Sequence, residues 1–97
     1  MVEEIKIGGI DYTVDFLNLS SRLDETYGMS MGFCVFDKNL IEVNENIHIE
    51  RQKQTIIHEM VHAMFFEIGI DQDEDTVNRL GIILHQVLKD NDFSWVK

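Results

Sequence analysis

The residues with the clearest capacity for chemistry are two histidines and a glutamate spaced as His58-Glu59-x-x-His62. On an α-helix, residues i and i+4 lie on one face, one turn apart, so two imidazoles can bind one metal ion from the same side. Glu59 is offset around the helix and can reach a water on that ion rather than the ion itself. The spacing therefore predicts a zinc site on a helix, with His58 and His62 as metal ligands and Glu59 as the catalytic base.

The residues around this motif indicate a polar site inside a core. Between Thr55 and Met64 the one acidic or basic side chain other than histidine is Glu59, whereas Glu50 and Lys53 one turn earlier carry the charges of a solvent-facing helix surface. The alternative interpretation is an ordinary buried helix with two hydrogen-bonded histidines. Burying His, Glu and His together without partners would be costly, so the apolar flanks favour a functional site.

At these residues the chain resembles the zincin metallopeptidases, whose extended motif has Thr or Val three places before the first histidine and uncharged residues around the motif. The matching residues are Thr55, Ile56, Met60, Val61, Ala63 and Met64. Within the zincins, residues 32–91 are similar to small phage and mobile-element proteins of the ImmA/IrrE type, in which a strand pair leads into the motif helix and a second helix follows. The resemblance implies a zinc cofactor and an edge strand, here 32–36, that accepts an extended substrate.

Catalytic zinc usually has three protein ligands and one open position for water, so one ligand is still missing. A third histidine of the metzincin type is excluded, because Phe65 and Ile68 occupy the positions of its glycine and histidine. The resemblance to gluzincins implies Glu74, since the second helix of ImmA/IrrE-type proteins carries Glu, two spacers, a small residue and Asn. Glu74 and Asn78 fit this pattern, with Val77 in place of the usual alanine.

Other acids remain open as the third ligand, because Glu74 also fits a structural role. Asp71 has the character of a helix N-cap with Glu74 at N3, close to a capping box, and acids suit the positive end of a helix dipole. Asp75 is the next candidate, followed by Asp71 and Asp73.

His85 is a further alternative ligand. It lies about 16 Å from Glu74 along the predicted helix at 1.5 Å per residue, so the two do not easily reach one ion. The expected role of His85 is that of a partly buried helix residue, or of a group that steadies the oxyanion of a tetrahedral intermediate. Tyr27 and His48 are weaker candidates for that second role.

The strands that must position the site form two predicted hairpins. Alternating runs at 4–7 and 10–16 flank Gly8-Gly9, which is typical of a tight primed turn. Residues 32–36 and 40–44 form the second hairpin. The segment 17–27 is expected to hold a short helix or an ordered loop.

Two helices follow, from about Glu50 to Ile68 and from about Asp73 to Lys89, with Gly69 ending the first in the left-handed conformation. The short gap predicts an antiparallel or crossed pair. A glycine inside a helix lowers the stability of the helix by about 1 kcal/mol relative to alanine. Gly81 is therefore expected where the second helix closely approaches the first. The expected buried flank of the second helix is Val77, Leu80, Leu84, Val87 and Leu88, and the segment 93–96 is expected to fold back onto the core or to form a docking patch.

The prediction is one α+β domain over 1–97: a small, mostly antiparallel sheet packed on two helices, in the manner of a minimal zincin.

Composition limits the partners. The net charge is −10 over 97 residues, which argues against nonspecific nucleic-acid binding. The acidity favours basic partners, or alternatively serves only to keep a small protein in solution. The single cysteine, Cys34, cannot form an internal disulfide and is expected to be a small strand residue rather than a metal ligand. The chain shows no signal peptide and no apolar run long enough for a membrane helix, so a cytoplasmic location is expected, that of the host cell if the gene belongs to a phage.

The sequence thus predicts a zinc metalloendopeptidase that hydrolyses a peptide bond in a protein or peptide. The resemblance implies that the substrate is a specific regulatory protein. The alternative is a noncatalytic, zinc-stabilised binding module that docks a basic or regulatory protein; such a module would close the metal with a fourth protein ligand, another acid or His85.

Overall fold

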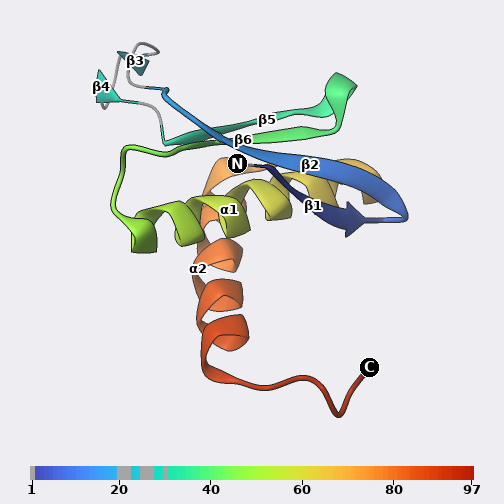
Figure 1. The fold of residues 1–97 in the computed structure, drawn as a ribbon. Coiled ribbons are helices and arrows are strands. Elements are labelled where there is room, and N and C mark those ends of the chain that lie inside the picture. Colours follow the sequence, from blue (N-terminus) through green and yellow to red (C-terminus); the bar gives the residue numbers. More distant parts are fainter. Residues whose placement is uncertain (1, 20–22, 25–27, 30) are drawn as a thin grey trace.

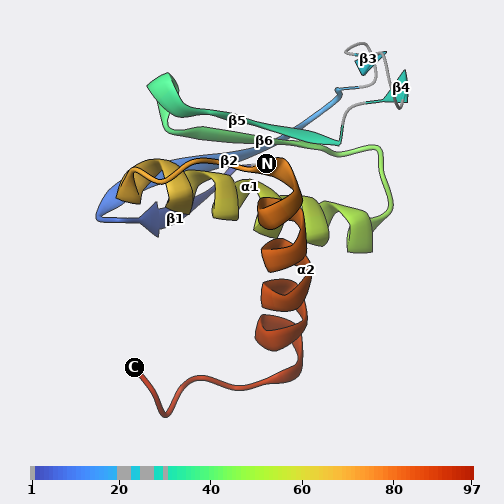
Figure 2. The same ribbon diagram turned by 180° about the vertical axis from the view of Figure 1, so that it is seen from behind.

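The computed structural model describes residues 2–19, 23–24, 28–29 and 31–97. Helix α1 (Ile49–Ile68) lies against one face of a four-stranded sheet, and helix α2 (Glu74–Asp90) crosses α1 and extends beyond it, away from the sheet (Figures 1 and 2). The expected α+β architecture is therefore confirmed. In the part of the chain that the structure describes, neither helix is long and apolar enough to cross a membrane.

The sheet joins the two predicted hairpins in the order β1-β2-β6-β5. The first hairpin pairs β1 (Val2–Ile7) with β2 (Ile10–Leu17), and the second pairs β5 (Gly32–Val35) with β6 (Leu40–Asn44), both antiparallel. The hairpins meet through a parallel pair, β2 with β6, so the sheet is mixed. This order leaves β5 at one edge of the sheet.

The connections follow from their residues. Gly8 and Gly9 have φ values of 59° and 81°, as a primed two-residue turn requires. A 3-10 turn, η1 (Phe36–Lys38), and a left-handed Asn39 join β5 to β6. Two short strands, β3 (Leu23–Asp24) and β4 (Gly28–Met29), pair with each other, while the rest of the predicted loop or helix at 17–27 lies largely outside the described residues.

The core forms where the sheet meets α1. Alternate residues of β2, Tyr12 and Val14, are buried, as are Ile41 and Val43 of β6, and all four pack with Ala63 of α1. Burying a side chain of the Val or Ile class stabilises the fold by roughly 1.5–3 kcal/mol. The period-two pattern of the strands therefore fixes which face of the sheet receives the helix that carries His58 and His62.

The boundaries of α1 are set at both ends by specific groups. His48 is the N-cap, and its Nδ1 accepts a hydrogen bond from the backbone N–H of Glu50 at 3.1 Å. Gly69, with φ of 72°, ends the helix, and the N–H of Ile70 reaches back to the carbonyl oxygen of Phe65 at 3.0 Å. The predicted end of the first helix is confirmed.

The start of α2 corrects one expectation. The N-cap is Asp73, not Asp71: the Asp73 carboxylate accepts hydrogen bonds from the backbone N–H of Thr76 at 3.0 Å and from its hydroxyl at 2.6 Å. These bonds hold the pKa of Asp73 below its usual range. Glu74 is consequently the first residue of the helix and takes no part in the cap.

The far half of α2 and the segment after it also differ from expectation. Val77 and Gly81 are buried and Leu84 and Val87 half-buried, but Leu80 and Leu88 are exposed. Leu80 lies between the buried Val77 and Gly81 in sequence, so it is off the face that packs on α1, whereas Leu88 is near the end of α2, which extends beyond α1 (Figure 2). Residues 91–97 do not fold back onto the core, since Trp95 is 82% exposed, and the alternative expectation of a docking patch stays a prediction.

Candidate metal centre

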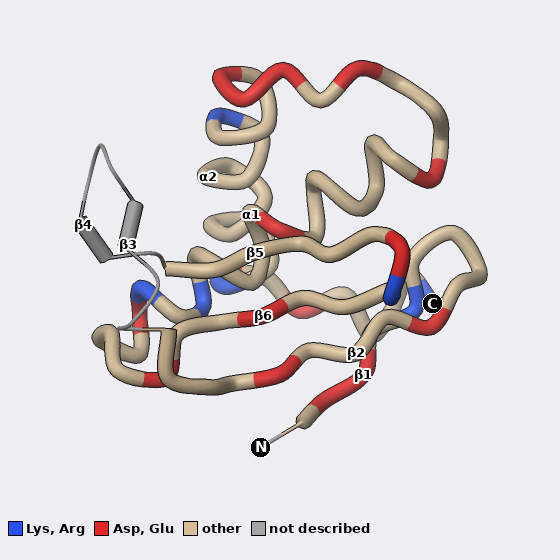
Figure 3. Tube along the Cα trace, turned by 90° about the horizontal axis from the view of Figure 1, so that it is seen from above, with Lys and Arg blue, Asp and Glu red and all other residues tan. Residues whose placement is uncertain are grey.

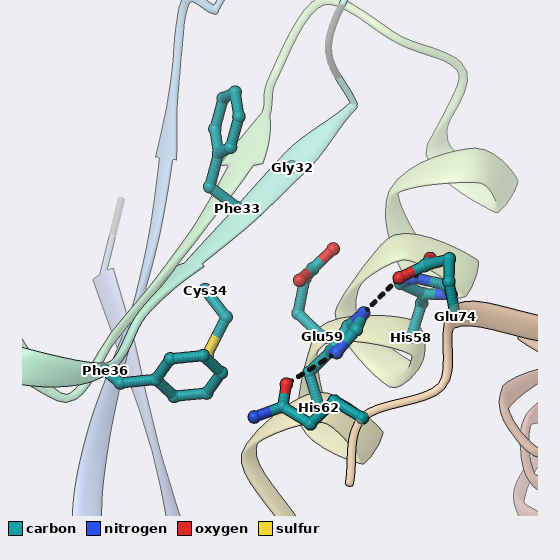
Figure 4. A pocket seen from close by; sticks show the side chains of 9 residues that line it. Gly32, Phe33, Cys34, Phe36, His58, Glu59, His62 and Glu74 are labelled. Atoms are coloured by element: carbon teal, nitrogen blue, oxygen red, sulfur yellow. Dashed lines mark hydrogen bonds and ion pairs between the residues drawn. The ribbon is translucent and has the colours of Figure 1, made fainter. Parts of the chain in front are cut away.

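His58 and His62 lie one turn apart on the face of α1 that is turned toward the start of α2 (Figure 4). Their ring centroids are 5.0 Å apart, with the rings inclined at 68°. Both side chains are partly shielded from solvent by the sheet edge and the loop between the helices. The i, i+4 spacing thus places two imidazole Nε2 atoms side by side, as the sequence predicts.

Glu74 completes a group of three. One carboxylate oxygen lies 2.8 Å from Nε2 of His58, and the other lies 2.9 Å from Nε2 of His62. The three donor groups lie within 4.8 Å of one another. The structure therefore forms a candidate metal site from the three residues that the sequence and the resemblance indicate.

The other candidate ligands are engaged elsewhere. Asp75 pairs with Arg79 at 3.2 Å, Asp73 caps α2, and Asp71 is exposed in the loop before it. His85 lines a separate hollow that contains none of the three. Among the residues that the structure describes, no further His, Cys, Asp or Glu joins the group.

The donor set suits a zinc ion. Bonds of about 2.0–2.2 Å to nitrogen and oxygen in tetrahedral geometry place ligand atoms roughly 3.3 Å apart. The present spacings of 2.8 and 2.9 Å would thus open by about half an ångström on metal binding. Glu74 can make this adjustment, because its side chain is 70% exposed and the residue lies at the start of α2 rather than in the core.

Gln72 orients His62. Its Oε1 lies 2.9 Å from Nδ1 of His62, and as a carbonyl oxygen it accepts a hydrogen bond from the N–H of that nitrogen. In the neutral ring, the lone pair is then on Nε2, the atom that faces Glu74. A partner of this kind fixes the tautomer and ring orientation of a metal-ligating histidine. Gln72 is a site residue that was not predicted from the sequence; the signal for it was its position as a polar residue two places before the expected ligand Glu74.

Glu59 lies beside the group but not in it. Its side chain is only 9% exposed, and its carboxylate lies in the gap between α1 and β5 (Figure 4). Burial raises the pKa of Glu59 to about 7, with the negative charge of Glu74 acting in the same direction and His62 opposing both. A carboxylate whose pKa is near neutrality is suited to accept and return a proton.

A groove of about 320 Å³ runs over the group and is bounded on the other side by β5 and Phe36. Gly32 permits this close approach: a Cβ there would lie 2.5 Å from Cγ2 of Thr55 and 2.7 Å from the carbonyl oxygen of Glu42. Thr55, one turn before His58, therefore packs directly against the edge strand.

The pairing of β5 determines where its backbone groups point. The N–H of Asn44 donates to the carbonyl oxygen of Met31 at 2.8 Å, and hydrogen-bonded pairs alternate along antiparallel strands. Gly32 and Cys34 are therefore the residues of β5 whose N–H and C=O groups point away from β6 and toward the groove. Cys34 is confirmed as a strand residue, and burial together with the charge of Glu59 raises its pKa to about 12.

The candidates for the oxyanion role are not brought to the site. His48 caps the first turn of α1, and His85 lies on the far half of α2. Tyr27 lies outside the described residues.

Comparisons of the chain with protein-family models, with curated proteins and with solved structures found no match. The functional interpretation therefore depends on the geometry of the site: three converging donors, a buried carboxylate beside them, and a groove along an edge strand.

Proposed function

We propose that the protein is a zinc-dependent endopeptidase with a zincin-like site. The observation that carries this proposal is the convergence of His58, His62 and Glu74 beside a fourth, buried carboxylate that does not join them. Three protein donors leave one position for a nonprotein ligand, as catalytic zinc sites do. When bound there, zinc would lower the pKa of a water toward neutrality and polarise a substrate carbonyl.

The residues of the chain have distinct roles in this proposal. His58, His62 and Glu74 hold the ion, and Gln72 keeps the Nε2 of His62 directed at it. Glu59 accepts a proton from the attacking water and delivers it to the leaving amine, the two transfers that a general acid–base residue makes.

The groove favours an extended peptide. The backbone groups of Gly32 and Cys34 offer donors and acceptors for a strand added to β5, so the scissile bond would pass over the histidines. No Lys or Arg is among the described residues that line the groove. It therefore offers no cation for a substrate's terminal carboxylate, which favours cleavage within a chain over removal of its last residue.

Charge around the site favours a basic substrate segment. Acidic residues gather along the loop between the helices and the first turn of α2 (Figure 3), and Gln72 and Glu74 of this segment line the groove. The loop acids are Asp71 and Asp73, and Asp75 follows Glu74 on the helix. Together with the net charge of −10, they would attract Lys- and Arg-containing segments, in keeping with a basic regulatory protein as the substrate.

The test is the variant Glu59→Gln with a panel of unstructured peptides, each with basic residues. The zinc-loaded wild type should cleave internal bonds, and the variant should bind zinc as tightly but lose about 10²–10⁴-fold in rate, the usual contribution of general acid–base catalysis. Metal content measured on the same samples separates a lost base from a lost ion. Equal rates for wild type and variant would remove Glu59 from its role.

A wild type that binds zinc with a fourth protein ligand and cleaves no peptide would instead identify the noncatalytic binding module. Among the described residues, His85 lines a separate hollow, and Glu59 lies beside the three donors without joining them, so the geometry favours the open, catalytic form.

A further inference from the structure

A second hollow, of about 330 Å³, lies between α1 and α2 and shares no lining residue with the metal site. Its wall is apolar, with Ile56 and Ile57 from α1 and Leu88 from α2. This volume is at the small end of ligand pockets, about 300–1,000 Å³, and suits one large aromatic side chain. The remaining lining residues, which form a polar rim, are Glu50, Lys53, His85 and Lys89.

The rim of this hollow carries a net positive charge on a strongly acidic chain. Lys53 and Lys89 approach the same carboxylate, that of Glu50, at 3.6 and 3.9 Å. Two ammonium groups share one acid, so one positive charge is left over. The hollow therefore favours an occupant that combines an aromatic group with a nearby negative charge.

The segment after α2 has this chemistry. It contains the one tryptophan of the chain, Trp95, which is 82% exposed, and Asp92; Asp90, the last residue of α2, also precedes the indole. The turn is ordered by its own hydrogen bonds: the Asp92 carboxylate accepts from the N–H of Ser94 at 2.9 Å, and the N–H of Val96 reaches the Phe93 carbonyl oxygen at 3.0 Å. Within one chain the Trp95 side chain is therefore in solvent, and the ribbon after α2 runs to the C-terminus apart from the sheet (Figures 1 and 2).

We propose that two copies of this chain associate by exchanging residues 91–97, with Trp95 of each copy filling the hollow between α1 and α2 of the other. The aspartates before each indole would then approach Lys53 and Lys89 of the opposite copy. The arrangement is its own complement about a two-fold axis near the ends of the α2 helices, so it closes as a dimer. It depends on neither zinc nor the proposed peptidase activity.

The buried area indicates a reversible dimer. An indole buries roughly 200 Å², with a similar area of the hollow, so two exchanged residues remove about 800 Å² from water. The apolar neighbour Val96 adds to this area. The sum stays below the lower limit of stable specific interfaces, about 1,200 Å², so association should be weak and should depend on concentration across the accessible range.

Because the chain has one tryptophan, its fluorescence reports the occupancy of the hollow directly. Emission spectra and sedimentation equilibrium are recorded over the same dilution series of the full chain. The expected result is a shift of the emission to shorter wavelength as concentration rises, at the concentrations where the mass doubles. A protein that stays monomeric at every concentration overturns the proposal, whatever its emission. If the emission of that monomer is already shifted to shorter wavelength, the indole is folded back within its own chain. A dimer whose emission does not shift also overturns it.

Matched variants locate the acceptor. Leu88→Glu places a carboxylate in the hollow, whereas Ile82→Glu makes the same change on α2 at a residue that is 65% exposed and does not line it. Leu88→Glu should weaken association by about tenfold or more, since an uncompensated carboxylate would be buried, and Ile82→Glu should not. The surface variant Lys53→Glu should weaken it as well. Leu88→Glu and Lys53→Glu dimers as stable as those of wild type would contradict the proposal.

Discussion

Glu74 links the two helices through one side chain. It is the first residue of α2, yet its two carboxylate oxygens contact both histidines of α1. These contacts are ion pairs only where a histidine is protonated, and with a carboxylate that is 70% exposed they contribute little stability, about 0–1 kcal/mol. Their position matters more than their energy, because the carboxylate already spans the two nitrogens that a metal would need.

Replacing Glu74 with alanine should therefore weaken zinc binding strongly, whereas Asp75→Ala should leave it unchanged. Asp75 is the adjacent acid on the same helix turn and pairs with Arg79, so it is a matched control for lost negative charge. Calorimetric titration with zinc measures both affinities. Equal affinities for Glu74→Ala and wild type would place the third ligand elsewhere.

Cys34 faces the groove as a neutral thiol. Burial raises its pKa to about 12 from an ordinary value of 9.0, with the charge of Glu59 contributing further, so at pH 8 the thiolate is roughly a thousandfold scarcer than in an exposed cysteine. A raised pKa for an acid means that the thiol stays protonated until the pH approaches that value. Alkylation of the metal-free protein should be slow at pH 8 and should quicken through pH 11, with ordinary reactivity restored in denaturant. Fast alkylation of the folded protein at pH 8 would contradict this.

Among the elements, the contact between α1 and α2 decides the geometry of the site. Gly81 is buried, and a Cβ there would lie 3.5 Å from Cα of His58, an ordinary van der Waals distance. The expected close approach of the two helices at this glycine is confirmed. An alanine fits the space, but a longer side chain does not.

Gly81→Ala should consequently keep zinc affinity and stabilise α2 by up to about 1 kcal/mol, from the difference in helix propensity. Gly81→Leu should push α2 away from His58, shift Glu74 with it and lower zinc affinity. The alanine variant is the control for the substitution itself. Thermal melts and zinc titrations of the pair test this account, and a leucine variant that binds zinc normally would argue against it.

Local signals predicted most of the elements. Gly8-Gly9 and Gly69 each require positive φ, and each ends an element where the sequence places it. The cap of α2 was assigned wrongly because several acids precede the helix, and the choice of Asp73 depends on which carboxylate meets the N–H and hydroxyl of Thr76. Propensity alone does not distinguish acids two positions apart.

Long-range relations were harder to predict. The parallel pairing of β2 with β6 joins two hairpins that are separate in the sequence, and no turn residue signals it. The contact of Gln72 with His62 likewise depends on the path of the loop between the helices. The metal-site residues were predictable because fixed helical spacing positions His58 and His62, whereas Glu74 was selected by a resemblance and only the folded chain brings it to them.

In the whole molecule, α1 lies between the sheet and α2. The sheet buries one side of α1 in a continuous core, while α2 holds the other side mainly near its own start. A metal ion at His58, His62 and Glu74 would join α2 to the body at this start. The groove, the edge strand and the acidic loop all meet at the same place, so the proposed function belongs there.

The most direct test of that account is a crystal structure of the zinc-loaded protein, with the ion located by anomalous diffraction at the zinc edge. We expect one ion bound by Nε2 of His58, Nε2 of His62 and the Glu74 carboxylate, with a nonprotein oxygen in the fourth position within reach of Glu59. Zinc bound at other residues, or closed off here by a fourth protein ligand, would contradict the proposed catalytic site.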